Sequence, residues 1–423
     1  MRSPSLETLA GIDFGTSNSS VGLFRDKHPY LLEFAGEGLT VPSAVFYPNE
    51  SRDIIFGRQA VANYTQGFEG RLLRSLKSVL GTSLMKEKTQ IRNRKVAFAD
   101  IMQDFFGYLK AQLETERGAS VDSVVLGRPV HFVDDDAQRD REAQDQLQQI
   151  AQQSGFRHIE FQYEPVAAAL SYESTIAGEE LAVIVDVGGG TADFSILRLS
   201  ADRHAQADRQ ADVLGNMGVH IGGTDFDRLL SLQSVMPSLG FGSTVKHTDR
   251  TLPGSVYHEL ATWHRIPLLY NAQTINHIKQ MRLDAVATDK LESLEYIVQH
   301  RLGHALARAV ESAKISLSSE QVATVSLSSG ATSLVECQAT LSDMEQAIAS
   351  AIDALKACVS EGLAQAGVQG SEIVSVFYTG GSSGIPCLRS AFKEMLPGAK
   401  HISGDAFGSV GLGLAIDAGR RFI

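Results

Sequence analysis

Short apolar runs of strand length alternate along this chain with longer segments in which apolar residues recur at helical spacing. Ser123–Phe132 is an apolar strand that ends in a proline-containing loop, and residues 134–156 have the pattern of a helix closed by Gly155. The acidic start of that helix, Asp134 to Asp136, is typical of an N-terminal cap. Another apolar strand follows at residues 181–187. This alternation predicts an α/β fold built in layers.

One pattern occurs twice. "GIDFGTSNSSVGLF" (residues 11–24) is matched by "IVDVGGGTADFSIL" (residues 184–197), and their aspartates, Asp13 and Asp186, are 173 positions apart. In both, a strand leads to an aspartate, a glycine-rich turn with a hydroxyl residue follows, and a second strand leaves. The repeat predicts two similar hairpins, one in each half of the chain, which can face each other across a cleft.

The chemistry of this pair suits a phosphate. Glycines let backbone amides approach phosphate oxygens closely, and Thr16, Ser17 and Thr191 add hydroxyl donors. Asp13 and Asp186 would repel a phosphate unless a cation lay between them, which implies Mg²⁺ held partly through water. Either hairpin alone can be an ordinary tight turn, but the matched pair favours a phosphate-binding cleft.

A third segment, residues 301–319, has an apolar stripe at helical spacing. Glu311, Lys314 and Ser318 lie on the opposite side of this predicted helix, where a solvated polar face is the simplest interpretation. Ile315 projects to the same side, which is unusual for a face that only meets water. Elsewhere, Asp225 and Asp227 are interpreted as helix caps, and Trp263 as a packing residue.

Composition restricts the classes of function. The chain has 423 residues and a net charge of −11, so we expect two or three domains, no nucleic-acid partner and no attraction to an anionic membrane. Three widely spaced cysteines suit a reducing compartment, and no apolar run approaches the length of a membrane span. We therefore expect a cytoplasmic monomer.

Seven motifs in order resemble the nucleotide-binding domain of the seventy-kilodalton heat-shock chaperones, within the actin-like ATPase superfamily. They are "GIDFGTSNSS", "YEPVAAALSYE", "VDVGGGTADFSI", "HIGGTDFDRLL", "ESAKISLSS", "YTGGSSGIPCLRSAF" and "DAFGSVGLGLAIDAG". The resemblance is closest to shortened bacterial members of the YegD type. It implies two lobes, each a mixed sheet flanked by helices, with ATP in the cleft between them. Lobe I would comprise residues 1–180 and the C-terminal helix 405–423, and lobe II residues 181–404.

The resemblance also implies roles for individual residues. Asp13 and Asp186 would hold Mg²⁺, and the catalytic residues would be Lys77, Glu164, Thr191 and Asp193. ATP or ADP would be held through its phosphates by Gly15, Thr16, Ser17, Asn18, Gly188, Gly189, Gly190, Thr191, Gly222 and Gly223. The adenosine side would be formed by Glu311, Lys314, Ile315, Ser318, Gly380, Gly381, Ser382, Gly384 and Asp405.

The chain departs from the family pattern in three places. Gly384 and Ile315 stand where relatives have arginines beside the adenine, which should weaken binding by about 0.5–2 kcal/mol. The tip of lobe II, about residues 228–310, is enlarged and offers a surface for a protein co-factor or client, or merely a larger lobe. The chain ends at "AGRRFI", so we expect no peptide-binding domain.

The favoured function is an ATP-binding and slowly ATP-hydrolysing switch related to the chaperones. Three other functions stay open: a nucleotide sensor that does not hydrolyse ATP, a small-molecule kinase of the same superfamily, and a filament-forming actin-like protein. An acceptor for phosphate would distinguish the kinase, and nucleotide-dependent sedimentation would distinguish the filament.

Overall fold

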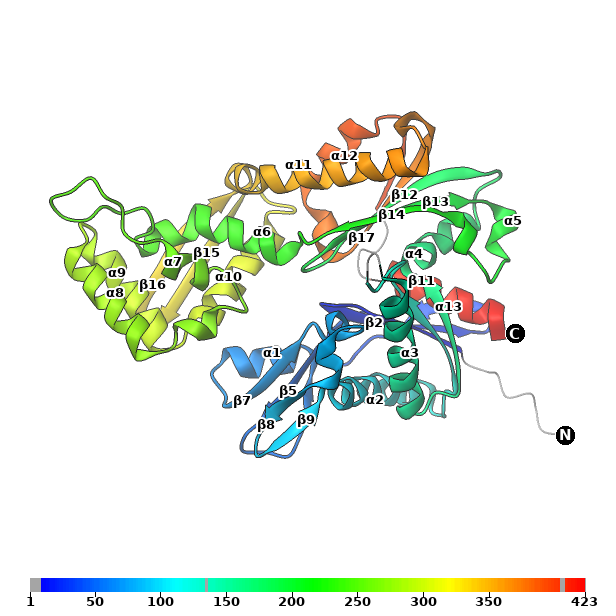
Figure 1. Cartoon of the computed structure of the whole chain (residues 1–423), viewed down its shortest axis with the longest axis horizontal. Coiled ribbons are helices and arrows are strands. Elements are labelled where there is room, and N and C mark those ends of the chain that lie inside the picture. The colour runs from blue at the N-terminus through cyan, green and yellow to red at the C-terminus, as the bar shows by residue number, and fades with distance from the viewer. Residues whose placement is uncertain (1–8, 134–135, 404–407, 423) are drawn as a thin grey trace.

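The computed structural model describes residues 9–133, 136–403 and 408–422. Its first large sheet has the strand order β11-β10-β1-β2-β3, with β4 paired to β2 (Figure 1). β1 is parallel to β10 and antiparallel to β2. These strands are β1 (Leu9–Phe14), β2 (Asn18–Arg25), β3 (His28–Leu31), β4 (Val41–Pro42), β10 (Ser123–Arg128) and β11 (His158–Tyr163).

A second large sheet repeats this plan with the strand order β14-β13-β12-β17-β18. β12 is antiparallel to β13, as β1 is to β2, and β12 is parallel to β17, as β1 is to β10. The sheet contains β12 (Glu180–Val187), β13 (Ala192–Leu199), β14 (Val213–Val219), β17 (Ile373–Thr379) and β18 (Lys400–Ser403). The two predicted hairpins and the predicted mixed α/β fold are confirmed, whereas the lobe boundaries at residues 180 and 404 stay a prediction.

Helices cover both faces of the first sheet. One face packs against α2 (Phe98–Arg117) and α3 (Ala137–Gln153). The predicted cap of α3 is confirmed for Asp136, whose carboxylate accepts a hydrogen bond of 3.0 Å from the Arg139 amide, while residues 134–135 lie outside the described part. The other face packs against α4 (Glu164–Glu173) and α13 (Ser409–Phe422) in a core that also includes the second sheet.

Glycines allow α13 to approach its neighbours very closely. A Cβ atom added to Gly413 would lie 1.8 Å from the carbonyl oxygen of Ala167 in α4. One added to Gly22 in β2 would lie 2.1 Å from the carbonyl oxygen of Gly411. The glycine-rich sequence of α13 is therefore a packing requirement, since any side chain would separate these backbones.

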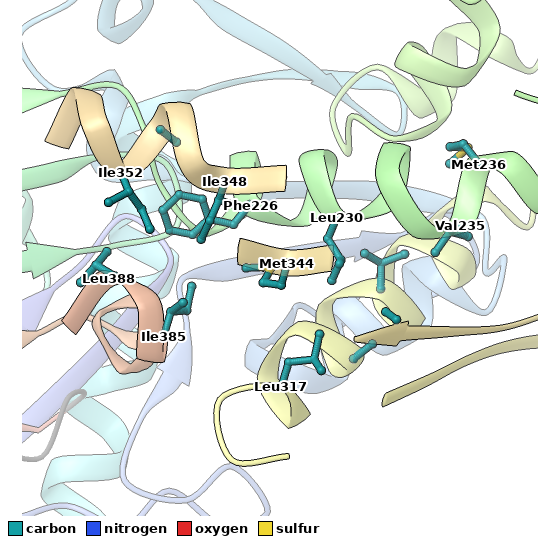
Figure 2. Packing of buried hydrophobic residues seen from close by; sticks show 14 of the residues in the cluster. Phe226, Leu230, Val235, Met236, Leu317, Met344, Ile348, Ile352, Ile385 and Leu388 are labelled. Atoms are coloured by element: carbon teal, nitrogen blue, oxygen red, sulfur yellow. The ribbon is translucent and has the colours of Figure 1, made fainter. Parts of the chain in front are cut away.

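A large apolar core lies in the second half of the molecule, and Figure 2 shows part of it around Phe226, Leu230 and Met344. Val256, Tyr257 and Leu260 of the enlarged tip belong to this same core, so the tip extends the lobe. The elements here are α6 (Gly223–Leu230), α7 (Ser255–Leu260), α8 (Ala272–Asp284), α9 (Thr288–Gln299), α10 (Gly303–Ser316), β15 (Val322–Ser329), β16 (Thr332–Thr340), α11 (Leu341–Ala366) and α12 (Pro386–Met395).

Smaller elements complete the fold. They are β5 (Ala44–Pro48), β6 (Ile55–Phe56), α1 (Gly57–Thr65), β7 (Gly70–Arg74), β8 (Lys88–Ile91), β9 (Arg94–Ala97) and α5 (Ala201–His204). In the described part of the chain, no helix has the length and apolar character needed to cross a bilayer.

An ion cluster with a buried centre connects the end of α4 to the loop after α5. The side chains of Arg209 and Glu173 are both 0% exposed, and their two hydrogen bonds measure 2.6 and 2.8 Å. Arg209 also pairs with Asp212, which in turn contacts Arg203. Burying these charges would cost free energy if any of them were unpaired, and here each charged side chain has a partner of opposite charge.

Candidate functional site

A cavity of about 580 Å³ opens between the ends of the two hairpins. It is also lined by α10 and by the loop after β17. The structure brings most of the predicted site residues to its wall: Asp13, Gly15, Thr16, Ser17, Asn18, Lys77, Glu164, Asp186, Gly188, Gly189, Thr191, Asp193, Gly223, Glu311, Lys314, Ile315, Gly380, Gly381 and Ser382.

Five predicted site residues are not part of this lining. Gly190, Gly222, Ser318 and Gly384 are absent from it, and Asp405 lies outside the described residues. Gly384 has open space around its Cα, so a larger side chain would fit there. For these five, ligand contact stays a prediction.

The two turns are closely packed against their surroundings. In the first, a Cβ on Gly15 would lie 2.1 Å from the carbonyl oxygen of Asn18, so glycine is required there. In the second, the amide of Gly188 donates to the carbonyl of Thr191 at 2.9 Å. A Cβ on Gly189 would lie 2.1 Å from Ser17 Oγ, which shows that the two turns meet at the base of the cavity.

The loop before α6 supports the second turn from behind. The amides of Gly223 and Thr224 donate to the carbonyls of Gly188 and Gly189 at 2.9 and 2.7 Å. A Cβ on Gly222 would lie 2.5 Å from the amide nitrogen of Gly190. Gly222 therefore positions the turn from a site behind the cavity wall. The interpretation of Asp225 as a cap is confirmed, because its carboxylate accepts from the Gly222 amide at 3.1 Å.

One lysine lies among the acidic groups at the base of the cavity. Lys77 Nζ is 2.5 Å from Glu164 Oε1, although the two residues are 87 positions apart. Burial by itself lowers the pKa of Lys77, but the negative charges of Glu164 and Asp13 raise it by more than burial lowers it. The net pKa of Lys77 therefore lies above its usual value. Lys77 thus carries a fixed positive charge where a phosphate would meet the two turns.

The two aspartates are buried beside other acidic groups, which favours their protonated form in the ligand-free protein. Burial, followed by repulsion from Glu164, raises the pKa of Asp13 to about 8. Burial, followed by repulsion from Asp193 and then Glu164, raises the pKa of Asp186 to about 7. Both carboxyls would ionise readily if a cation came between them, so the residues fit a bound Mg²⁺.

The described residues contain no group of three His, Cys, Asp or Glu side chains placed to hold a metal ion. A divalent cation beside Asp13 and Asp186 would therefore take further oxygens from water and from a ligand phosphate, as Mg²⁺ usually does.

These pKa shifts predict how Mg²⁺ affects stability. In the ligand-free protein, Asp13 and Asp186 hold protons that the unfolded chain releases above its carboxyl pKa of about 3.8. Their contribution to stability is present below that pH and is lost as pH rises through about 7 to 8. Mg²⁺ should therefore raise the melting temperature more at about pH 8.5 than at about pH 6. Thermal unfolding measures this, and the doubly substituted Asp13→Asn/Asp186→Asn protein should lose the pH dependence. An equal Mg²⁺ effect at both pH values would contradict the prediction.

On α10 the structure corrects the expected solvated face. Lys314 is buried, and its Nζ lies 2.8 Å from Asp227 Oδ1 and 3.2 Å from the Gly223 carbonyl oxygen. The helix ends at Ser316, so Ser318 is beyond it, while Ile315 is 62% exposed at the cavity wall. The interpretation of Asp227 as a cap is wrong, because its carboxylate pairs with Lys314 and lines the cavity.

Sequence reasoning missed several cavity residues. Asp227 has a pKa raised to about 6, because burial outweighs the opposing effect of Lys314. Arg58, Arg74 and Arg308 also line the cavity but belong to no motif that we identified. Only the convergence of α1, β7 and α10 in space brings them together, and no local pattern could have indicated it.

The matched hairpins, the two mixed sheets of equal plan and the cavity between them define an actin-like nucleotide-binding fold. The sequence model of the Hsp70 protein family matches residues 9–235 and 286–419. The chain therefore belongs to the Hsp70 family, the heat-shock chaperones with this ATPase fold. Residues 236–285 are outside the match.

Similar proteins include three bacterial chaperones named DnaK. That of Ureaplasma parvum serovar 3 is 34% identical over 53% of this chain and 34% of its own length. That of Ureaplasma urealyticum serovar 10 is 27% identical over 98% of this chain and 58% of its own length. That of Deinococcus deserti is 26% identical over 97% of this chain and 59% of its own length. The matches thus cover between 34% and 59% of the length of these relatives.

Proposed function

We propose that this chain is a Mg²⁺-dependent ATP-binding and slowly ATP-hydrolysing switch of the Hsp70 type. One observation carries the proposal: Lys77 is paired with Glu164 at the base of a cavity that both phosphate-type hairpins line. Membership of the Hsp70 family supports the same conclusion. The peptide-binding activity of full-length relatives is not part of this proposal.

The proposed mechanism depends on charge and position, as phosphoryl transfer requires. Backbone amides of the two turns hold the phosphates, and Lys77 offsets the negative charge that develops on them. Glu164, Asp193 and Thr191 orient the attacking water; the Thr191 hydroxyl donates to Asp193 Oδ2 at 3.2 Å. When bound beside Asp13 and Asp186, Mg²⁺ supplies further neutralisation of phosphate charge.

A nucleotide sensor that binds without hydrolysis is the second candidate. It is favoured by the adenosine side, where Gly384 leaves open space and Ile315 is exposed. Neither residue can stack on a base with a cationic group, so at these two positions the base would have at most apolar contact.

Single-turnover hydrolysis of Mg·ATP, with no acceptor added, tests the proposal. Slow release of ADP and phosphate would support the switch, and binding without any release would favour the sensor. ADP release that requires a sugar would indicate a kinase instead. Absence of Mg·ATP binding by calorimetry would refute the proposed function.

A cytoplasmic location remains part of the proposal. It is supported by the three cysteines, Cys337, Cys358 and Cys387, none of which forms a disulfide in the structure.

A further inference from the structure

The segment outside the family match makes direct contact with the opposite wall of the cavity. Trp263 lies in the turn after α7, within residues 236–285. The guanidinium carbon of Arg74, at the end of β7, lies 5.0 Å from the centroid of the Trp263 ring. This is a cation–π contact between two parts of the chain that the cavity otherwise separates.

Neighbouring residues make further contacts between α1 and α10. His304 of α10 lies with its ring centroid 4.7 Å from that of Trp263 and 5.0 Å from that of Tyr64 in α1. Arg308, also of α10, donates from Nη1 to the Thr65 hydroxyl at 2.9 Å. In Figure 1, α1 and β7 belong to the blue N-terminal part of the chain and α10 to the green and yellow part facing it.

Arg74 is also directed to the site itself. It lines the main cavity, and among the described residues no hydrogen bond or ion pair is formed by its guanidinium. Burial lowers its pKa, while the charges of Glu311 and Asp227 act in the opposite direction. One side of Arg74 is therefore covered by an indole ring, and its donors remain available to a ligand.

We propose that Trp263 and Arg74 form a clasp that joins the inserted segment to the opposite wall of the cavity and sets the rate at which nucleotide leaves. This inference rests on the proposed function for the identity of the ligand. A bound nucleotide leaves the cavity when α1 and β7 separate from α10, and that movement must break the Arg74–Trp263 contact.

The test is the dissociation of radiolabelled Mg·ATP after a chase with excess unlabelled ATP. Arg74→Met keeps the length of the side chain but removes its charge, and it should accelerate release roughly threefold to tenfold. Arg71→Met is the matched control: Arg71 is an exposed arginine of the same strand and is not part of the cavity lining. It should release nucleotide at the wild-type rate.

Trp263 is the only tryptophan of the chain, so its fluorescence reports the clasp directly. Acrylamide should quench this fluorescence more strongly in Arg74→Met than in Arg71→Met, even without nucleotide. If Arg74→Met fails to fold, Trp263→Phe and Thr65→Val replace it in the release assay, and each should accelerate release by about twofold or more.

Unchanged release in Arg74→Met, with quenching equal to that of the control, would overturn the clasp and leave the proposed function standing. Absence of Mg·ATP binding by the wild-type protein would overturn the proposed function. In that case the quenching comparison would still decide whether the clasp exists.

Discussion

Lys77→Ala should slow single-turnover hydrolysis of Mg·ATP roughly tenfold to a hundredfold. The substitution removes the charge that pairs with Glu164 at 2.5 Å, and with it the charge-assisted contact that we propose Lys77 makes to the transferring phosphate. Such a contact contributes about 1.5–3 kcal/mol, which corresponds to that loss of rate. The variant also leaves Asp13, Glu164 and Asp186 without a nearby lysine, so its dependence on Mg²⁺ should increase.

Lys86→Ala is the matched control for this experiment. Lys86 is an exposed lysine at the end of the next short turn of the chain and does not line the cavity. It should hydrolyse Mg·ATP at the wild-type rate. If Lys77→Ala did the same while binding ATP normally, Lys77 would have no part in the mechanism.

Glu173→Ala should lower the free energy of unfolding by about 3–5 kcal/mol. Glu173 accepts two hydrogen bonds from Arg209, and neither side chain is exposed. Without Glu173, the Arg209 guanidinium stays buried with Asp212 as its remaining acidic partner. The amide of Ser200 also loses its acceptor, Glu173 Oε1. Urea denaturation followed by circular dichroism measures the loss.

An exposed glutamate nearby provides the comparison. Glu179 forms ion pairs with Arg198 and Arg203, but its side chain is 57% exposed. Glu179→Ala should therefore cost less than about 1 kcal/mol. A similar loss in the two variants would show that burial of the Arg209–Glu173 pair has no special effect on stability.

The hairpin part of the site could be predicted because its chemistry is local. Asp13 and Asp186 each lie one residue before the end of a strand that leads into a glycine turn, so a short stretch of sequence contains both the fold and the ligand chemistry. The partner of Lys77 is 87 positions away, and the family resemblance implies a catalytic role for Lys77 and for Glu164 but not that they pair. Local patterns indicate which residues are polar, but they do not indicate which polar residues contact one another in the folded chain.

The helix α10 shows the limit of periodicity. Helical spacing alone would put Lys314 on a solvated face, because it is opposite the apolar stripe, and only the family resemblance placed it at the adenosine side. In the structure it is buried and pairs with Asp227. Helical spacing distinguishes apolar from polar sides, and a polar side can face either water or a polar cavity. Arg74 could not be predicted at all, because its contact with Trp263 joins segments that no motif connects.

The position of α13 affects how the protein can be made on the ribosome. This helix packs against β1, the first described strand, but it is translated on the order of 400 residues later, which takes roughly 20–80 s. During that interval Gly11 and Gly22, whose Cα atoms pack against the backbone of α13, have no covering helix. The part of this face that α4 does not cover therefore stays exposed until α13 is synthesised, and the first sheet is fully covered only when α13 emerges.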